Sequence, residues 1–479
     1  MKKIINIENQ SGVNKLGVNL LIFTIGSFAS KLMNYFLLPF YTSVLTQTEY
    51  GVYDIVITTG NLLFPLFTLL ITEATMRFAL DRDIDNKKIF TISAIVVGVG
   101  CIIYLIMSPL LLLSEVFRHY YLYFVFYQIL HTINTLIAQY VKGKGSSLDF
   151  AVSGVIATAV TITLNIILMV VWKYGLTGYF ISSFAGTAVS IIYLFFKCRL
   201  YRDFCRITVT DKPLIKEMLK YSIPIMPNSI SWWISTSSDK YMISYVCGNA
   251  ANGLYSAAYK IPSLMTVFTN IFFTAWNISV VEDFGSENSK KMIVKIHNCF
   301  FSVVLILSSF IVCFTKPIVK IMFSDAFFEA WRFVPLLVTA YVFHDLAAYI
   351  GSIYTAGKKT KMLFISTLIG AVINIVLNVF FIPTVGALGG AVTTLISYFI
   401  VWLLRLVKSR KIIELKFNYL SNFISLILLM LQTIFVIMDI HFSYYVIFAI
   451  LILISLLNCK GVVEIFKMFL KKMTRRKSD

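Results

Sequence analysis

The sequence carries little charge. Only 14% of its 479 residues are Asp, Glu, Lys or Arg, whereas a typical soluble domain has about 25%. Hydrophobic residues make up 58%, and apolar stretches of about 20 residues, long enough to span a bilayer, recur along the whole chain. The composition therefore predicts a polytopic membrane protein with an all-α fold. Because these stretches do not alternate between apolar and polar residues, a transmembrane β-barrel is not expected.

Clustered cysteines are also missing. The seven Cys residues are scattered, mostly within apolar runs, with no CxxC pair and no Cys/His cluster. We therefore expect no disulfide framework and no metal site. We also expect no catalytic residue and no cofactor. The N-terminal MKKIINIENQSGVNKLG lacks a compact apolar core and a small-residue cleavage site. It is interpreted as a cytoplasmic tail or surface helix rather than a signal peptide.

Apolar runs and helix breakers predict about fourteen transmembrane helices. These are residues 16–45, 50–77, 89–113, 118–141, 149–172, 176–197, 214–247, 252–278, 292–315, 331–356, 362–382, 387–407, 417–438 and 441–458.

Lysine and arginine fall mainly on one side of these spans. Of the 42, 33 lie in the tails and loops of that side, including 405–416, and five lie on the other. The positive-inside rule then places both termini in the cytoplasm. The net charge of +19 is attributed to topology and lipid contact, so nucleic-acid binding is not expected. The remaining four basic residues fall inside spans: Lys31, Arg77, Lys240 and Lys260.

The two halves of the chain share features in the same order. EYGVYDIV (49–56) and ANGLYSAA (251–258) share Gly-x-Tyr, and Gly175/Gly178 and Gly386/Gly389 occupy equivalent outer turns after a helix with an Asn near its end. This indicates a duplication of six spans, which gives two pseudo-symmetric lobes around a central cavity. We expect an N-lobe at 1–208 and a C-lobe at 209–412. Residues 413–479 would form two accessory spans and a basic tail.

Ionisable residues inside spans usually face a cavity or a partner and mark a pathway. Besides the four cations, the candidates are Glu73, Asp239, His344 and Asp345. Asp239 and Lys240 are adjacent, so they project about 100° apart on a helix and cannot neutralise each other. The hydroxyl-rich run SISWWISTSSDK suggests that this helix lines a wet space. Cations in excess of acids favour an anionic ligand such as a phosphate or pyrophosphate.

The chain resembles the polysaccharide repeat-unit (oligosaccharide) flippases of the multidrug/oligosaccharidyl-lipid/polysaccharide exporter superfamily. The resemblance covers nearly the whole length. Its most specific parts are TEATMRFALDRD at the end of span 2 and YSIPIMPNSISWWISTSSDKYMIS in span 7.

This resemblance implies alternating access that carries an undecaprenyl-pyrophosphate-linked oligosaccharide across the bacterial plasma (inner) membrane. The pathway would be O-antigen, capsule, lipopolysaccharide or exopolysaccharide biosynthesis, with a polysaccharide polymerase and a chain-length regulator as partners. It also implies that Lys31, Lys240, Lys260 and Arg77 bind the headgroup. Asp239, Glu73, Asp345 and His344 would serve Na⁺ or H⁺ coupling or organise charge.

Three alternatives remain open. A multidrug/cation antiporter of the same architecture should bind cations and carry unpaired acids. A peptidoglycan lipid-precursor flippase should have a more basic cavity. A membrane polymerase or ligase usually has a large outer loop, whereas the longest outer connection here is 316–330.

Overall fold

The computed structural model describes residues 35, 37–81, 83–282, 287–357, 360–410, 419–440 and 443–475. Within these ranges the chain is helical and has no strand, which confirms the all-α fold. Ten of the described helices are long and apolar enough to cross a membrane. The expected number of fourteen stays a prediction. Most of the first expected span, and with it Lys31, lies outside the described residues.

The chain divides into two compact units. The first contains residues 1–45 and 52–230, and the second contains residues 46–51 and 231–479. Two helices, α3 (Gln47–Thr68) and α11 (Met226–Cys247), contribute residues to both units. Residues 209–230, which we expected in the C-lobe, group with the first unit. The expected division at 208 and 412 stays a prediction.

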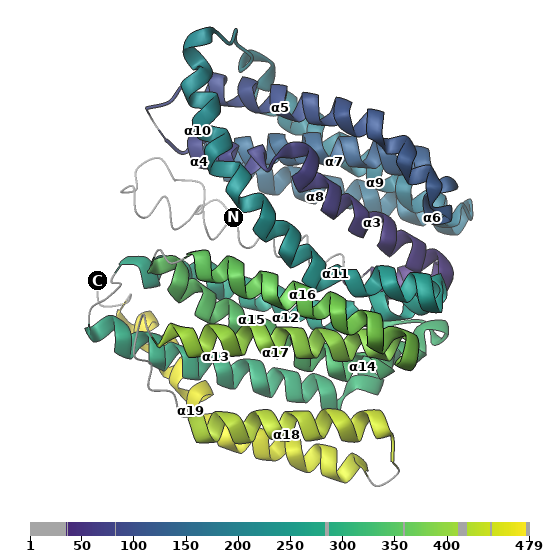
Figure 1. Cartoon of the computed structure of the whole chain (residues 1–479), viewed down its shortest axis with the longest axis vertical. Helices are drawn as coiled ribbons and strands as arrows, with labels where there is room; N and C mark the ends of the chain where they lie inside the picture. Colours follow the sequence, from purple (N-terminus) through teal and green to yellow (C-terminus); the bar gives the residue numbers. More distant parts are fainter. Residues whose placement is uncertain are drawn as a thin grey trace. The chain divides into compact units, whose positions relative to one another are not determined.

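The first unit contains the helices between α2 and the start of α11 (Figure 1). Their bounds are α2 Leu38–Val44, α4 Ile71–Ala79, α5 Asn86–Met107, η1 Ser108–Leu113, α6 Glu115–Arg118, α7 Tyr121–Gly143, α8 Ser147–Asn165, the π-helix η2 Ile166–Val171, α9 Gly175–Lys197, η3 Leu200–Arg202, η4 Val209–Asp211, α10 Lys212–Ser222 and η5 Ile223–Ile225.

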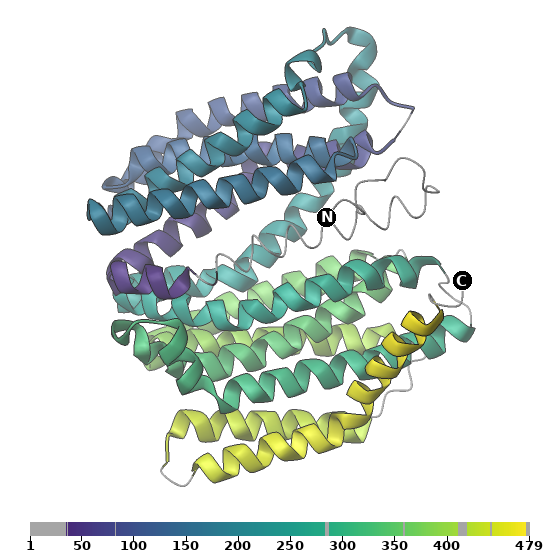
Figure 2. The ribbon, with the colours of Figure 1, turned by 180° about the vertical axis from the view of Figure 1, so that it is seen from behind.

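The second unit contains the rest of α11 and the helices that follow it. Their bounds are α12 Asn249–Glu282, α13 Glu287–Cys313, α14 Thr315–Met322, η6 Asp325–Arg332, α15 Val334–Ala356, α16 Thr360–Val385, α17 Ala387–Ser409, α18 Tyr419–Met438 and α19 Ser443–Arg475. Figure 2 shows α18 and α19 packed side by side at one edge of this unit. At its centre, α15 packs against α12, α13 and α17 and is the most deeply buried of the ten apolar helices.

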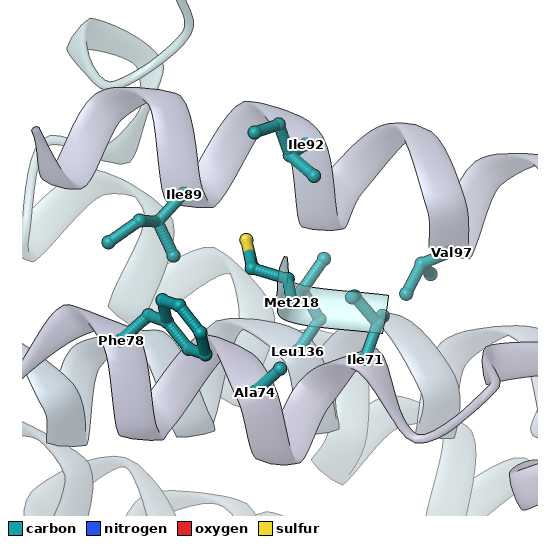
Figure 3. Packing of buried hydrophobic residues seen from close by; sticks show 8 residues of the cluster. All are labelled: Ile71, Ala74, Phe78, Ile89, Ile92, Val97, Leu136 and Met218. Atoms are coloured by element: carbon teal, nitrogen blue, oxygen red, sulfur yellow. The ribbon is translucent and has the colours of Figure 1, made fainter. Parts of the chain in front are cut away.

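Lipid-facing and protein-facing surfaces can be distinguished along single helices. α5 exposes Ile95, Val99, Ile102 and Ile106 at spacings of three to four residues, which is one helical face. Its opposite face packs into a core of α4, α5, α7 and α10 (Figure 3) that contains Ile71, Ala74, Phe78, Ile89, Ile92, Val97, Leu136 and Met218. An exposed apolar stripe on one face and a packed core on the other are what a membrane helix at a lipid boundary requires.

The basic connection between spans 6 and 7 is docked on the first unit. Asp203 accepts from Lys144 Nζ at 2.7 Å, and Asp211 accepts from Lys88 Nζ at 2.7 Å. Met218 of α10 is fully buried in the core of Figure 3, which stabilises the docking by roughly 1.5–3 kcal/mol. α10 therefore places its apolar face against protein. The 3-10 turn η5, which contains Pro224, separates α10 from α11.

The repeated Gly-x-Tyr motifs pack against each other. A Cβ atom added at Gly51 would lie 1.9 Å from the carbonyl oxygen of Asn249, and one added at Gly253 would lie 2.0 Å from that of Gln47. Asn252 Nδ2 also donates to the Gly51 carbonyl at 3.1 Å. The contact is reciprocal, because each glycine meets the residue four positions before the other. Only a residue without a side chain permits this approach of two helices.

The two outer turns are also built alike. Gly175 and Gly386 both have positive φ, at 51° and 70°, which glycine adopts without a steric penalty. Three residues later, Gly178 and Gly389 pack tightly against the preceding helix. Added Cβ atoms there would lie 3.1 Å from Leu168 Cβ and 2.5 Å from the Phe381 carbonyl oxygen.

Candidate functional site

The hydroxyl-rich face of α11 is largely packed against protein. Ser231, Ser235 and Ser237 are 4%, 1% and 9% exposed. Ser235 Oγ donates to the Ser231 carbonyl at 3.1 Å. The expectation that this helix lines a wet space is therefore wrong for these three side chains. Ser235 is bonded within α11, and Ser237 Oγ lies 3.3 Å from Thr236 Oγ1 of the same helix.

Asp239 is held by donors from three helices. It is fully buried, and its Oδ2 accepts from the Tyr255 hydroxyl at 2.5 Å, from Thr394 Oγ1 at 3.1 Å and from the Tyr259 hydroxyl at 3.5 Å. Its Oδ1 accepts from the backbone N–H of Lys240 at 2.9 Å. Tyr255 and Tyr259 belong to α12 and Thr394 to α17, so one carboxylate joins these helices to α11. The charge-organising role of Asp239 stays a prediction.

Lys240 contacts the aromatic ring of Tyr259. The side chain is half-buried, and its ammonium lies 5.3 Å from the centroid of the Tyr259 ring, within the range of a cation–π contact. Asp239 and Lys240, both in the described part of the chain, form no ion pair. The predicted divergence of the two side chains on the helix is the physical reason.

An amide network lies beside Asp239. Ser238 Oγ donates to Asn374 Oδ1 at 2.7 Å, Asn378 Nδ2 donates to the same oxygen at 3.1 Å, and Thr393 donates to Asn378 Oδ1. The two asparagines lie in α16, in the stretch where the repeated Asn was noted. In the first unit, Asn165 Nδ2 donates to the Tyr41 hydroxyl at 2.8 Å. These amides join neighbouring helices within each unit.

His344 and Asp345 form a bonded pair on α15. His344 Nδ1 lies 2.9 Å from Asp345 Oδ1, and the two side chains are 20% and 1% exposed. The imidazole ring lies 5.3 Å from each of the Trp232, Tyr341 and Tyr398 rings. The structure thus brings a histidine–carboxylate pair into an aromatic cluster within the second unit.

Lys260 is half-buried on α12, one turn after Tyr255 and Ser256. Pro262 follows it inside the same helix and cannot donate the backbone hydrogen bond that an ordinary residue would make. Ser263 Oγ donates to the Lys260 carbonyl at 2.8 Å. The two described candidate lysines, Lys240 and Lys260, therefore lie on consecutive helices of one unit.

Glu73 and Arg77 lie on α4 of the first unit, and both are exposed. Glu73 Oε1 accepts from Gln139 Nε2 of α7 at 3.0 Å, and Gln139 Oε1 accepts from Lys142 Nζ at 3.3 Å. The i, i+4 ion pair that their spacing allows is not formed between these two described residues. α4 itself begins after Leu69 and Leu70, which both have φ of 50°, a conformation that costs leucine roughly 1–2 kcal/mol per residue.

Sequence reasoning missed a buried arginine. Arg405 was counted with the cytoplasmic basic residues, but it is 3% exposed inside α17. It donates to Ser366 Oγ at 2.9 Å, to the Ala347 carbonyl at 2.9 Å and to Thr367 Oγ1 at 3.0 Å. Its guanidinium also lies 5.7 Å from the Trp232 ring centroid. The sequence feature that could have indicated its burial is its position within the apolar run VWLLRLV.

Two further polar residues of the first unit were also missed. Asp54 of α3 is 5% exposed and takes part in a polar interaction. It directly follows the repeated Gly-x-Tyr motif. Its position as a charged residue inside the predicted span 50–77 could have marked it as a candidate. Gln139 links Glu73 to Lys142. Because glutamine is uncharged, a search for ionisable residues could not find it.

The second unit contains an apolar groove of about 830 Å³. Its walls come from α13, α15, α17 and α18 and include Phe343, Phe399, Trp402, Phe423 and Met430. Polar atoms contribute almost nothing to the lining; His297 and Asn422 are its polar side chains. A groove of this chemistry suits a hydrocarbon chain.

Two family models match the sequence. The model for polysaccharide biosynthesis proteins matches residues 16–277, which is more than half of the chain, and the MatE model matches residues 224–380.

Curated relatives are distant and align in part. The chain is 23% identical over 270 residues to "Probable low-salt glycan biosynthesis flippase Agl15" of Haloferax volcanii, covering 54% of this chain and 57% of that protein. It is 26% identical over 192 residues to an uncharacterized membrane protein of Methanocaldococcus jannaschii, covering 39% of this chain and 44% of that protein. The chain thus spans about half the length of the curated relatives it matches.

Solved structures share the fold. The lipid II flippase MurJ in an inward closed conformation aligns with a TM-score of 0.71 at 15% identity, covering 94% of this chain and 99% of that chain. An inward-facing multidrug resistance MATE family transporter of the MOP superfamily aligns with a TM-score of 0.61 at 15% identity, covering 79% and 93%. The chain therefore belongs to the polysaccharide biosynthesis protein family and has the fold of the MOP-superfamily transporters.

Proposed function

We propose that this protein is a flippase that moves a lipid-linked saccharide from one leaflet of a membrane to the other. The family match supports this proposal, as does the similarity to the Haloferax volcanii relative, whose name describes a glycan biosynthesis flippase. More specifically, we propose that the substrate is an undecaprenyl-pyrophosphate-linked oligosaccharide and that the protein lies in the bacterial inner membrane. The protein would then act in O-antigen, capsule or exopolysaccharide synthesis, with a polymerase and a chain-length regulator as partners.

The observation that carries the proposal is the pair of lysines on α11 and α12, the consecutive helices of predicted spans 7 and 8. Lys240 lies seven residues before the end of α11 and Lys260 lies in α12, and both side chains are half-buried. A charge inside the bilayer is unfavourable unless it serves a ligand, a partner or water. Moving a pyrophosphate across the hydrocarbon core unaided is unfavourable for the same reason. Lysine suits a headgroup that must bind and then leave, because its ammonium is a point charge without a fixed bidentate geometry.

The apolar groove supports the lipid half of the proposal. Its aromatic and aliphatic lining offers van der Waals contacts to an isoprenoid chain and requires no dehydration of polar groups. The groove and the two lysines lie in the same unit. The second unit thus contains groups suited to both parts of a lipid-linked, negatively charged substrate.

Deletion and complementation test the proposal. Cells that lack the protein should accumulate lipid-linked single saccharide units and lose the surface polysaccharide, and the wild-type gene should restore both. Lys240→Ala and Lys260→Ala should complement poorly, whereas Lys216→Ala, on the exposed face of α10, should complement fully. Unchanged polysaccharide and unchanged intermediates in the deletion strain would refute the function.

A multidrug/cation antiporter is the second candidate, because the MatE model matches residues 224–380. Such a protein should confer drug resistance that depends on Asp239 or Asp345. The buried hydroxyl donors around Asp239 argue against it, because they already occupy the carboxylate that an organic cation would need.

A further inference from the structure

Predicted span 2 is interrupted in the structure. α3 ends at Thr68 and α4 begins at Ile71, and Leu69 and Leu70 between them both have a φ of 50°. Beyond the break, Ile71 packs in the same core as Val97 of α5 (Figure 3). Polar backbone groups at such a break in a membrane helix need partners from neighbouring helices, side chains or ordered water.

A small cavity lies beside this break. Its volume is about 10 Å³, and a void of about 10–15 Å³ is enough for one water molecule. The residues that line it come from α3, α5 and α7 and are Phe67, Thr68, Gly100, Cys101, Tyr104, Gln128, Ile129 and Thr132. Because these described lining residues carry no charge, the cavity suits a small neutral polar molecule better than an ion.

Backbone packing fixes one wall of the cavity. Gly100 brings α5 against the end of α3, where an added Cβ atom would lie 1.9 Å from the Phe67 carbonyl oxygen. Gly100 and Phe67 both line the cavity, so a side-chain rotation at Gly100 cannot close it. The Tyr104 ring lies edge-on to the Phe67 ring, with centroids 5.3 Å apart, which holds its hydroxyl beside the break.

Two buried side chains of the lining have polar atoms that the described residues leave unbonded. Tyr104 and Gln128 are each 3% exposed. The Tyr104 hydroxyl and Gln128 Oε1 have no hydrogen-bond partner within the described part of the chain. Gln128 Nε2 donates to the Gly60 carbonyl at 3.1 Å, which fixes the orientation of the amide because only the nitrogen can donate. Buried polar groups in native proteins nearly always have a partner, either in the protein or in ordered water.

The two atoms need partners of opposite kinds. A tyrosine hydroxyl has a proton to donate, whereas an amide oxygen can only accept. Tyr104 and Gln128, both described, do not bond to each other. A water molecule both donates and accepts, so one water between them satisfies both side chains.

We propose that this cavity is a binding site for one water molecule, which accepts from the Tyr104 hydroxyl and donates to Gln128 Oε1. The water joins α5 to α7 beside the point where α3 ends. It thereby stabilises the break from which α4, the helix of Glu73 and Arg77, begins. The site does not depend on the proposed flippase function or on the identity of the substrate.

Radiolytic labelling tests the proposal, because ionising radiation converts water into hydroxyl radicals that oxidise the nearest side chains. Tyr349 of α15 is the matched control: it is fully buried, and its hydroxyl donates to the Ile293 carbonyl at 2.8 Å. In purified full-length protein, mass spectrometry should find Tyr104 oxidised severalfold faster than Tyr349, although both side chains are buried. A rate for Tyr104 no higher than that for Tyr349 would overturn the proposal.

A pair of matched variants tests the second ligand of the water. Gln128→Met keeps the length of the side chain but removes the amide oxygen, so it should lower the oxidation rate of Tyr104 severalfold. Gln139→Met makes the same change on α7 at a residue outside the cavity lining and should leave that rate unchanged. Size-exclusion profiles and melting curves should show that each variant is folded.

An unchanged oxidation rate of Tyr104 in folded Gln128→Met would overturn the assignment of the water to these two side chains. If Gln128→Met does not fold, the comparison of Tyr104 with Tyr349 in the wild-type protein still decides the proposal. None of these measurements involves saccharide transport. A failed complementation experiment would therefore refute the flippase function and leave the water site intact.

Discussion

Adding one methyl group to either glycine of the reciprocal helix contact should destabilise the protein. In Gly51→Ala the new Cβ would meet a backbone carbonyl oxygen at 1.9 Å, and in Gly253→Ala at 2.0 Å. Because the opposing atom is backbone, no side-chain rotation relieves the contact, and the helices must move apart. Such overpacking typically costs about 1–3 kcal/mol, and a contact this short belongs near the upper end. Alanine in a helix interior recovers about 1 kcal/mol relative to glycine, so the net loss should be about 1–2 kcal/mol.

Gly98→Ala provides the matched control. Gly98 is an exposed glycine of α5, and an added Cβ there would meet nothing within 4 Å. The same substitution should therefore stabilise by about 1 kcal/mol from helix propensity alone. Relative to Gly98→Ala, the two contact variants should be weaker by about 2–3 kcal/mol. The double variant Gly51→Ala/Gly253→Ala should be less destabilised than the sum of the single changes, because one separation of the helices accommodates both methyl groups.

Melting of the detergent-purified variants at one fixed scan rate checks the order of stabilities, since membrane proteins of this size commonly unfold irreversibly. The expected order is Gly98→Ala above wild type, with Gly51→Ala and Gly253→Ala below it. Contact variants that melt as high as Gly98→Ala would refute the close approach of α3 and α12.

Three further outcomes follow from the structure. Arg405→Ala should cost about 2–4 kcal/mol, since it leaves a cavity and removes the hydrogen bonds to Ser366, Thr367 and the Ala347 carbonyl. The exposed Lys408→Ala should cost less than about 0.5 kcal/mol, and equal melting temperatures of the two variants would contradict the buried role of Arg405. Hydrogen bonds from Lys88 and Thr208 lower the pKa of Asp211 to about 2, so its stabilisation of the linker is complete above the ordinary carboxyl pKa of about 4 and is lost as the pH falls towards 2. Asp211→Asn should therefore raise amide exchange over 203–212 at neutral pH, and exchange equal to wild type would disprove the linkage. Lys240→Ala should insert normally but fail to flip substrate, and normal transport by this variant would leave Lys260 as the described lysine of the headgroup site.

The sequence predicted the class of the protein because class depends on composition and periodicity. Apolar runs of about 20 residues can only be helices in a bilayer, where every backbone polar group must be bonded within its own segment. The repeated Gly-x-Tyr and outer-turn glycines were visible for a similar reason. A positive φ or a close backbone approach restricts a position to glycine, so the glycine itself indicates this local geometry in the sequence. The divergence of Asp239 and Lys240 also followed from helix geometry alone.

Tertiary structure decided which polar groups have partners. Asp239 and Asp345 are both carboxylates inside predicted spans, yet one receives hydroxyls from Tyr255 and Thr394 while the other keeps an unbonded oxygen. Those donors come from residues 16 and 155 positions away, and no local pattern encodes such pairings. Arg405 was misassigned because a basic residue near the end of an apolar run has the same sequence signature whether it extends to the surface or turns inward. The direction it takes is set by acceptors on neighbouring helices, and only the packed structure supplies them.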